Sequence, residues 1–234
     1  MLRTHHLVWT VCLCVAGGLC VAEDKLAFTE PFNGKDLSGW KLRNDNKEKS
    51  KWAVGKAELS KENPAQLTIS SEGKELVNTS GSGVDIWSEQ KYGDAVIELE
   101  VMVPKGSNSG VYVMGEYEVQ VLDSFGKEKV GPGDLGGLYG ASAPLVNAAK
   151  APGEWQKFII DFRAPKFDEA GKKTANAKFV KVTLNGQVIH ENVEMKSQTP
   201  TGVTGKEAAT GPIMFQGDHG PVAYRNIRIL AIGK

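Results

Sequence analysis

The sequence predicts an all-β protein, a sandwich or barrel of short antiparallel strands. Glycine is abundant, with 27 residues in a chain of 234, and turn signals recur between short runs rich in β-branched and aromatic residues. No stretch keeps apolar residues at a spacing of 3.6 residues for three turns, so no long amphipathic helix is expected. The chain also has no internal repeat at the period of a solenoid or propeller. Together these observations favour a sandwich or barrel.

The first 22 residues have the pattern of a secretion signal. Arg3 precedes an almost wholly apolar run over residues 7–21, and small residues lie before a predicted cleavage site after Ala22. The apolar run is too short for a comfortable membrane span. We therefore expect residues 23–234 to form one secreted or periplasmic domain of about 210 residues.

Removal of this signal would change the inventory of reactive groups. A disulfide, a thiolate metal site and a cysteine nucleophile are all excluded, because the three cysteines of the chain lie inside the signal, at Cys12, Cys14 and Cys20. Arg3 is the only charge lost, so 27 basic residues face 28 acidic ones and the net charge is about −1. This balance indicates neither a nucleic acid nor an anionic membrane as a partner.

Residues 108–124 read as one strand with two different faces. One face is apolar, with Val111, Val113, Gly115, Tyr117, Val119 and Val121, and the other carries Tyr112, Met114, Glu116, Glu118 and Gln120. Acid and amide side chains in register are costly in a strand unless they line a wet groove or are fully hydrogen-bonded. We interpret this strand as the base of a binding site. A half-exposed edge strand with a solvated polar face would show the same alternation.

Before this segment, short strands are expected at 52–54, 67–69 and 76–77, and a longer one at 92–103. The break at residues 104–106 predicts that strand 92–103 and the central segment are antiparallel neighbours across a short loop. Glu98 and Glu100 lie on the polar face of the longer strand. Because no aromatic or amide residue accompanies them, we expect a structural role for both.

After the central segment comes a long connection, residues 123–154, with seven glycines and three prolines. Connections of this length in a compact domain are usually disordered or part of a binding site. A strand is expected at 155–162, and Asn185-Gly186 predicts a type I′ hairpin between strands 179–184 and 187–190. His190, at the hairpin end, is expected to be structural. Residues 165–177 and 197–211 are polar and are expected to be solvated loops.

The last part of the chain places a histidine in a tight turn. A short strand at 212–216 has Gln216 as the only polar side chain on its Met214 side, and Gly217-Asp218-His219-Gly220-Pro221 follows it. A glycine-flanked turn at a strand end can hold an imidazole at the rim of a cleft. An ordinary turn would have the same sequence. Strand 224–232 closes the sheet.

Four stretches, in order along nearly the whole mature chain, together resemble one family, the bacterial 3-keto-disaccharide hydrolase domain. They are FNGKDLSGW at 32–40, NSGVY at 108–112 with YEVQVLD at 117–123, the segment from Tyr139-Gly140 to Gly153-Glu154-Trp155, and Gly211-Pro212-Ile213 with Gln216, His219 and Arg225-Asn226-Ile227. The sequence departs from the family pattern at Met114 and Gln156, which affects substrate preference more than fold. The resemblance implies a concanavalin A-like jelly-roll β-sandwich of two antiparallel sheets that binds carbohydrate on its concave face. It also implies cleavage of glycosides already oxidised to a ketone at carbon 3.

Such a reaction requires a base near carbon 2, an acid near the leaving oxygen, and donors or a cation near the developing enolate. We expect Glu118 and His219 to be the catalytic pair. Substrate contacts are expected from Tyr112, Glu116, Gln120, Asp123, Tyr139, Gln216 and Asp218, with Asp123 reaching the groove only if a bulge or bend reorients it. A divalent metal held by Glu, Asp and His side chains could supply the electrophile, but the spacing is not diagnostic and the metal stays open.

Two other functions fit the same residues. A non-catalytic, lectin-like carbohydrate-binding module could use the same groove without turnover, since fold does not determine function. A retaining glycosidase could use Glu116 and Glu118. In that case the next alternating position, Gln120, lacks a third acid, and two acids on one strand need not straddle a glycosidic bond at about 5 Å.

Overall fold

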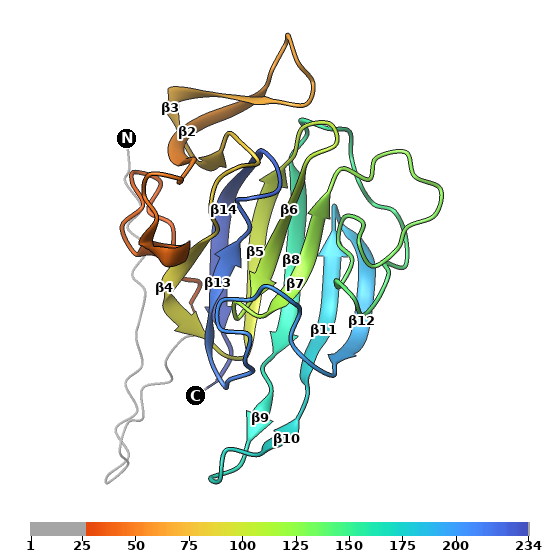
Figure 1. The fold of residues 1–234 in the computed structure, drawn as a ribbon. Helices are drawn as coiled ribbons and strands as arrows, with labels where there is room; N and C mark the ends of the chain where they lie inside the picture. The colour runs from red at the N-terminus through yellow and green to blue at the C-terminus, as the bar shows by residue number, and fades with distance from the viewer. Residues whose placement is uncertain (1–26, 234) are drawn as a thin grey trace, which may run out of the picture.

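The computed structural model describes residues 27–233 (Figure 1). Their strands are β1 (Trp40–Leu42), β2 (Trp52–Leu59), β3 (Leu67–Asn78), β4 (Ile86–Tyr92), β5 (Ala95–Met102), β6 (Asn108–Val113), β7 (Tyr117–Leu122), β8 (Gln156–Arg163), β9 (Lys166–Phe167), β10 (Lys173–Ala175), β11 (Ala177–Leu184), β12 (Gln187–Met195), β13 (Gly211–Phe215) and β14 (Val222–Ala231). A single 3₁₀ turn, η1 (Arg43–Asp45), is the helical element of these residues, and they contain no helix able to cross a membrane. The predicted signal, 1–22, lies outside the described residues, so export stays a prediction.

Two antiparallel sheets pack face to face, which confirms the predicted jelly-roll sandwich (Figure 1). The smaller sheet has the order β1-β4-β13-β6-β7, and the larger has the order β12-β11-β8-β5-β14-β3-β2. The pairs β2–β3, β6–β7 and β11–β12 are consecutive in the chain, whereas the other neighbouring strands come from distant parts of the sequence. The two sheets therefore bring chain segments together that the sequence keeps far apart.

The core between the sheets follows from period-two alternation of apolar residues. In β5, Ala95, Ile97, Leu99 and Val101 are buried on one face. Aromatic rings connect the two sheets, since Phe215 of β13 stacks on Tyr224 of β14 with ring centroids 4.0 Å apart. Burial of a large apolar side chain contributes roughly 1.5–3 kcal/mol, so this layer supplies most of the stability of residues 27–233, which contain no cysteine.

The predicted Asn-Gly hairpin is confirmed. Asn185 and Gly186 have φ angles of 52° and 83° between β11 and β12, as a type I′ turn requires. The structural role expected for His190 also agrees with its position. The side chain is buried, its Nε2 lies 2.8 Å from the Gly136 carbonyl oxygen, and burial lowers its pKa.

The predicted pairing of strand 92–103 with the central segment is wrong. β5 pairs with β8 and β14 in the larger sheet, whereas β6 lies in the smaller one. The break near Pro104 therefore carries the chain from one sheet to the other. Alternation along a strand shows which face is buried but does not show which sheet the strand joins. Glu98 and Glu100 have the structural role expected of them, since they form ion pairs with Arg228 and Arg225.

The central segment is a hairpin and not one strand. β6 and β7 pair antiparallel, with Met114, Gly115 and Glu116 in the turn between them. Met114 and Gly115 both have positive φ angles, of 54° and 69°. A methionine with positive φ is uncommon and leaves no turn signal in the sequence. The predicted placement of Tyr112 and Glu118 on the same face is still correct, because Tyr112 lies directly opposite Glu118 in the hairpin.

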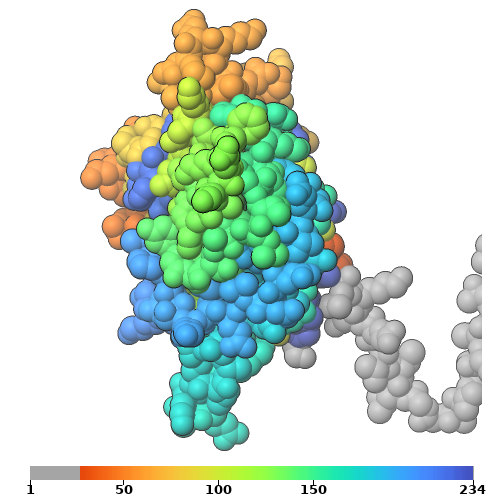
Figure 2. Space-filling model, turned by 90° about the vertical axis from the view of Figure 1, so that its right-hand side faces the viewer, coloured from red at the N-terminus to blue at the C-terminus, as the bar shows by residue number. Residues whose placement is uncertain are grey.

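Two predicted loops also contain ordered structure. Residues 165–177 include the small β9–β10 ribbon, which projects from the body in Figures 1 and 2. The connection 123–154, green in Figure 2, covers one side of the molecule. Its segment 136–139 hydrogen-bonds to the outer edge of β7, with Gln120 N donating to the Gly137 carbonyl and Gly136 N to the Gln120 carbonyl, both at 2.8 Å. The expected strands at 67–69 and 76–77 are parts of one strand, β3.

Candidate active site

A small cavity lies on the outer face of the smaller sheet. It has a volume of about 170 Å³ and is lined by Asn108, Tyr112, Glu118, Gln120, Tyr139, Pro200, Thr201, Gln216 and His219. Six of the nine residues predicted for the site are in this set, including both members of the catalytic pair. A larger hollow of about 530 Å³ lies on the other sheet, but two of its three acids, Glu98 and Glu100, are held in ion pairs, and the third, Glu30, is exposed. The smaller cavity is therefore the better candidate for chemistry.

Glu118 is held at the edge of the sheet by contacts on three sides. Its backbone N–H donates to Thr199 Oγ1 at 3.1 Å, and its carbonyl accepts from Tyr139 N at 3.1 Å. Its carboxylate Oε2 accepts a hydrogen bond from the Tyr112 hydroxyl at 2.9 Å. Gly110 leaves room for the other oxygen, since a Cβ atom there would lie 2.4 Å from Glu118 Oε1.

The environment of Glu118 raises its pKa to about 7. Burial is the largest cause, because only 4% of the residue is exposed. The hydrogen bond from Tyr112 and the charge of His219 lower the pKa, and the charge of Asp85 raises it slightly. A carboxyl group that titrates near neutral pH can both accept and return a proton under physiological conditions.

Tyr112 supports Glu118 instead of offering a ring to a sugar. Its ring is buried, and its hydroxyl lies 3.0 Å from Thr201 Oγ1 in addition to its bond with Glu118. Burial and the nearby Glu118 carboxylate raise the pKa of Tyr112, so it stays a neutral donor. Tyr139, at the rim of the cavity, is the more exposed ring and the better stacking surface.

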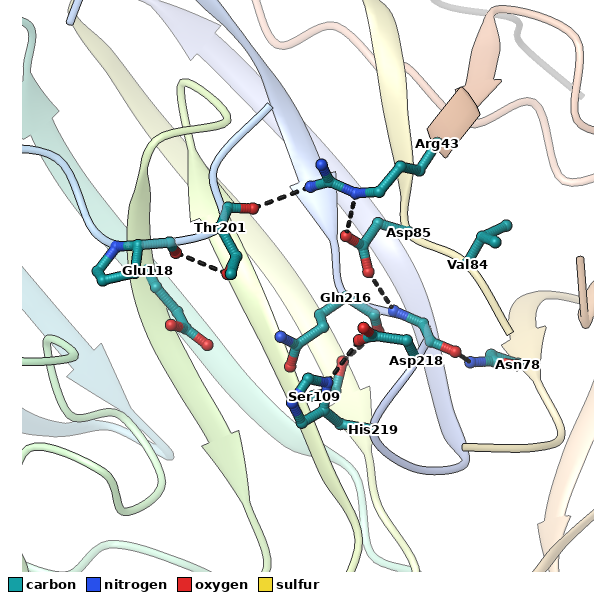
Figure 3. A network of polar contacts seen from close by, with 12 residues as sticks. Arg43, Asn78, Val84, Asp85, Ser109, Glu118, Thr201, Gln216, Asp218 and His219 are labelled. Atoms are coloured by element: carbon teal, nitrogen blue, oxygen red, sulfur yellow. Dashed lines mark hydrogen bonds and ion pairs between the residues drawn. The ribbon is translucent and has the colours of Figure 1, made fainter. Parts of the chain in front are cut away.

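His219 lies at the exposed rim of the cavity. Its Nδ1 contacts Asp218 Oδ1, and both side chains are about half exposed, at 48% and 50%. Asp218 does not line the cavity, so the structure places it as a residue that orients the imidazole. With Nδ1 engaged by the carboxylate, Nε2 is the ring nitrogen available to a ligand. Figure 3 shows Glu118, Gln216 and His219 around one common space.

An ion pair ties the two sides of this space together (Figure 3). Arg43 Nε donates to Asp85 Oδ2 at 2.7 Å, and its terminal nitrogen donates to the Thr201 carbonyl at 2.9 Å. Asp85 Oδ1 in turn accepts from Gly217 N at 3.0 Å. The pair thus connects the segment that contacts Tyr112 with the turn that carries His219.

Glu116 and Asp123 do not reach the cavity. Glu116 lies in the hairpin turn, and its carboxylate accepts hydrogen bonds from Thr204 N, Thr204 Oγ1 and Gly205 N. Asp123 accepts from the backbone N–H groups of Gly106 and Phe125 at the far end of β7. Both acids therefore stabilise loops, and the structure does not bring them into this cavity with the other predicted residues.

Sequence reasoning missed Asn108, Pro200 and Thr201 as cavity residues, and it missed Arg43 and Asp85 altogether. Asn108 stands at the start of the segment singled out from the sequence, so its position was a usable signal. Thr201 has a φ angle of 65° inside a polar loop. Its approach to Tyr112 depends on tertiary folding and leaves no local pattern.

The described residues contain no cluster of three or more His, Cys, Asp or Glu side chains that could hold a metal ion. Glu118 and His219 are the two such side chains in the cavity. Two such side chains are too few ligands for a metal site built from these residues alone. The reaction steps proposed for this protein therefore use protein groups.

A β-sandwich with a cavity lined by amides, aromatic rings, one carboxyl group and one imidazole is typical of proteins that bind or act on carbohydrate. A model of the 3-keto-alpha-glucoside-1,2-lyase-like domain matches residues 27–230. The chain belongs to this family, as its four motifs predicted.

Solved structures agree with this assignment. A candidate glycosyl hydrolase from Parabacteroides distasonis ATCC 8503 is 28% identical, with a TM-score of 0.68, and the match covers 88% of this chain and 84% of that one. A second candidate glycosyl hydrolase from the same organism is 20% identical, with a TM-score of 0.58, over 88% of this chain and 94% of that one. The second match supports the fold. Among curated proteins, none matches this chain.

Proposed function

We propose that this protein cleaves glycosides whose sugar carries a ketone at carbon 3, by elimination followed by hydration. The observation that supports this most directly is Glu118, a buried carboxyl group with a pKa of about 7 in the same cavity as His219. Membership of the 3-keto-alpha-glucoside-1,2-lyase-like family points to the same chemistry.

In the first step, the Glu118 carboxylate removes the proton from carbon 2, which the neighbouring ketone makes acidic. The electron pair forms an enolate, and the bond between carbon 1 and the aglycone oxygen then breaks. His219 donates a proton to that oxygen as it leaves. The products are the free aglycone and a sugar with a double bond between carbons 1 and 2, conjugated to the ketone.

In the second step, water adds across the new double bond. His219 takes a proton from the water as its oxygen bonds to carbon 1, and Glu118 returns its proton to carbon 2. Both groups are then back in their starting states. Gln120 and Gln216 can donate to sugar hydroxyls or to the enolate oxygen, where charge develops.

The position of each group suits its role. Glu118 is deep in the cavity, where the sugar ring would lie, and His219 is at the exposed rim, where the aglycone would leave. The cavity, at about 170 Å³, is smaller than the roughly 300–1,000 Å³ of pockets that enclose drug-sized ligands. It therefore fits a single ring, with the aglycone outside.

A retaining glycosidase that uses Glu116 and Glu118 is disfavoured. The Glu116 carboxylate is taken up by Thr204 and Gly205 and does not line the cavity. The two acids therefore do not flank one ligand.

The decisive experiment compares a 3-keto-glycoside with its parent glycoside, for the wild-type protein and for Glu118→Gln. We expect turnover of the keto compound alone, and loss of two to four orders of magnitude in kcat for the variant. Equal turnover of both compounds would favour an ordinary glycosidase. Binding of saccharides without cleavage of either compound would favour a lectin-like module.

We also propose that the protein acts outside the cytoplasm, which N-terminal sequencing of the mature protein would test.

A further inference from the structure

The face that carries Glu118 continues across the smaller sheet to a tryptophan. Strand register places Glu118 opposite Tyr112, Tyr112 opposite Met214, and Met214 opposite Trp87. Side chains directly opposite each other in antiparallel strands share a face of the sheet. Because strands lie about 4.8 Å apart, Trp87 is roughly 14 Å from Glu118 along this row.

Trp87 lines a second cavity of about 380 Å³, which is within the range of ligand pockets. Its apolar wall includes Trp87, Met114, Val203, Ala208 and Pro212, and its polar groups include Lys41, Lys91, Lys206, Thr204 and Thr210. An aromatic wall with hydroxyl and ammonium donors around it matches the apolar face and polar edge of a sugar ring.

One loop forms a wall of both cavities. Pro200 and Thr201 line the Glu118 cavity, whereas Val203 and Thr204 line the Trp87 cavity. Arg43 lies between the cavities, since it donates to the Thr201 carbonyl and its guanidinium carbon is 5.8 Å from the Trp87 ring centroid. A ligand in the second cavity would therefore contact the same loop that bounds the first.

The charges around the Trp87 cavity are mainly positive. Lys41 is in a loose, exposed ion pair with Glu89, 3.9 Å apart. Lys91 and Lys206 are exposed and are in none of the ion pairs found among residues 27–233. The remaining acid of the cavity, Glu116, is buried and accepts three hydrogen bonds from Thr204 and Gly205. Two ammonium groups are thus left for a ligand.

From these observations we infer that the Trp87 cavity is a second carbohydrate subsite, which binds a sugar bearing an acidic group. The ring lies against Trp87, and the acidic group faces Lys91 and Lys206. The ligand is therefore an anionic saccharide, and the group that carries the negative charge is a carboxylate or a sulfate. The subsite requires a carbohydrate ligand but does not depend on the cleavage reaction proposed above.

The test measures binding to the Glu118→Gln protein by calorimetry at low ionic strength, so that turnover plays no part. The probes are a neutral tetrasaccharide, a tetragalacturonate and a sulfated tetrasaccharide of matched length. We expect one or both acidic probes to bind at least tenfold more tightly than the neutral one. Equal affinity for all three would overturn the assignment of an acidic ligand. Tighter binding of only one acidic probe identifies the charged group.

Two sets of variants locate the site. Trp87→Ala is expected to weaken binding of the acidic probe at least tenfold, and the double variant Lys91→Glu with Lys206→Glu to weaken it equally while sparing the neutral probe. Trp155→Ala, at the residue before β8, and Lys181→Glu, on β11, are matched controls away from this face, since Trp155 also lies beneath an arginine, Arg225. If the variants and controls bind alike, the site lies elsewhere. The lysine changes are on exposed side chains, so they keep the test valid should Trp87→Ala fail to fold.

Discussion

Replacement of Glu118 by glutamine should stabilise this protein at neutral pH and leave its stability unchanged near pH 4. The Glu118 carboxyl has an ordinary pKa of 4.5 and a pKa of about 7 in the folded protein. Between these values the folded state holds a proton that the unfolded state has lost, so stability falls as pH rises through this window. Each pKa unit corresponds to about 1.4 kcal/mol, so the loss is about 3 kcal/mol and is complete above about pH 7.

Chemical denaturation of both proteins at about pH 4 and about pH 8 measures this effect directly. The variant should be more stable than the wild type by about 3 kcal/mol at the higher pH, and nearly equal at the lower pH. Because glutamine keeps an oxygen for the Tyr112 hydroxyl, the hydrogen bond should survive. A stability difference that is the same at both pH values would refute the reasoning, since it would not arise from ionisation. A variant less stable at pH 8 would do so as well.

Two further predictions concern the groups that hold Glu118 and His219. Arg43→Gln removes the ion pair with Asp85 and should cost about 1.5–3 kcal/mol of stability in urea denaturation, with a loss of kcat that exceeds any rise in KM. The matched change Arg228→Gln, on the larger sheet, should leave kcat unaltered, and equal effects of the two on kcat would argue against positioning by Arg43. Gly110→Ala places a Cβ atom 2.4 Å from Glu118 Oε1, so the carboxylate must move and kcat should fall by about an order of magnitude or more. Gly133→Ala, where the new Cβ atom meets nothing within 4 Å, is the control, and normal turnover by Gly110→Ala would show that Glu118 tolerates displacement.

The sequence predicted the buried faces of strands well, because alternation of apolar residues is a local property. It placed Tyr112, Glu118 and Gln120 on one face, and the structure confirms that these three line the same cavity. The turn at Met114 was not predictable, since a methionine with positive φ lacks the glycine or asparagine that usually marks such a turn. The hairpin preserved the face assignment because an odd number of residues, three, separates the two strands.

Side-chain roles that depend on distant segments were harder to predict. Glu116 and Glu118 look equivalent in the sequence, yet the Glu116 carboxylate accepts hydrogen bonds from Thr204 and Gly205, whereas Glu118 lines the cavity. Asp85 is buried beside Gly217, 132 residues away along the chain. No pattern within a strand can report such a contact.

Burial explains both the capacity of Glu118 to exchange a proton near neutral pH and the stability that its ionised form costs the folded protein. The same removal from water that raises its pKa to about 7 also makes its ionised form unfavourable in the folded state. β7 would be a free edge, but the segments at Thr199 and Tyr139 hydrogen-bond to the backbone of Glu118 and cover it. Those segments also form walls of the cavity, so the contacts that protect the edge of the sheet are the ones that exclude water from the carboxyl. A change that loosens either segment should therefore lower the pKa of Glu118 towards its ordinary value and thereby weaken it as a base.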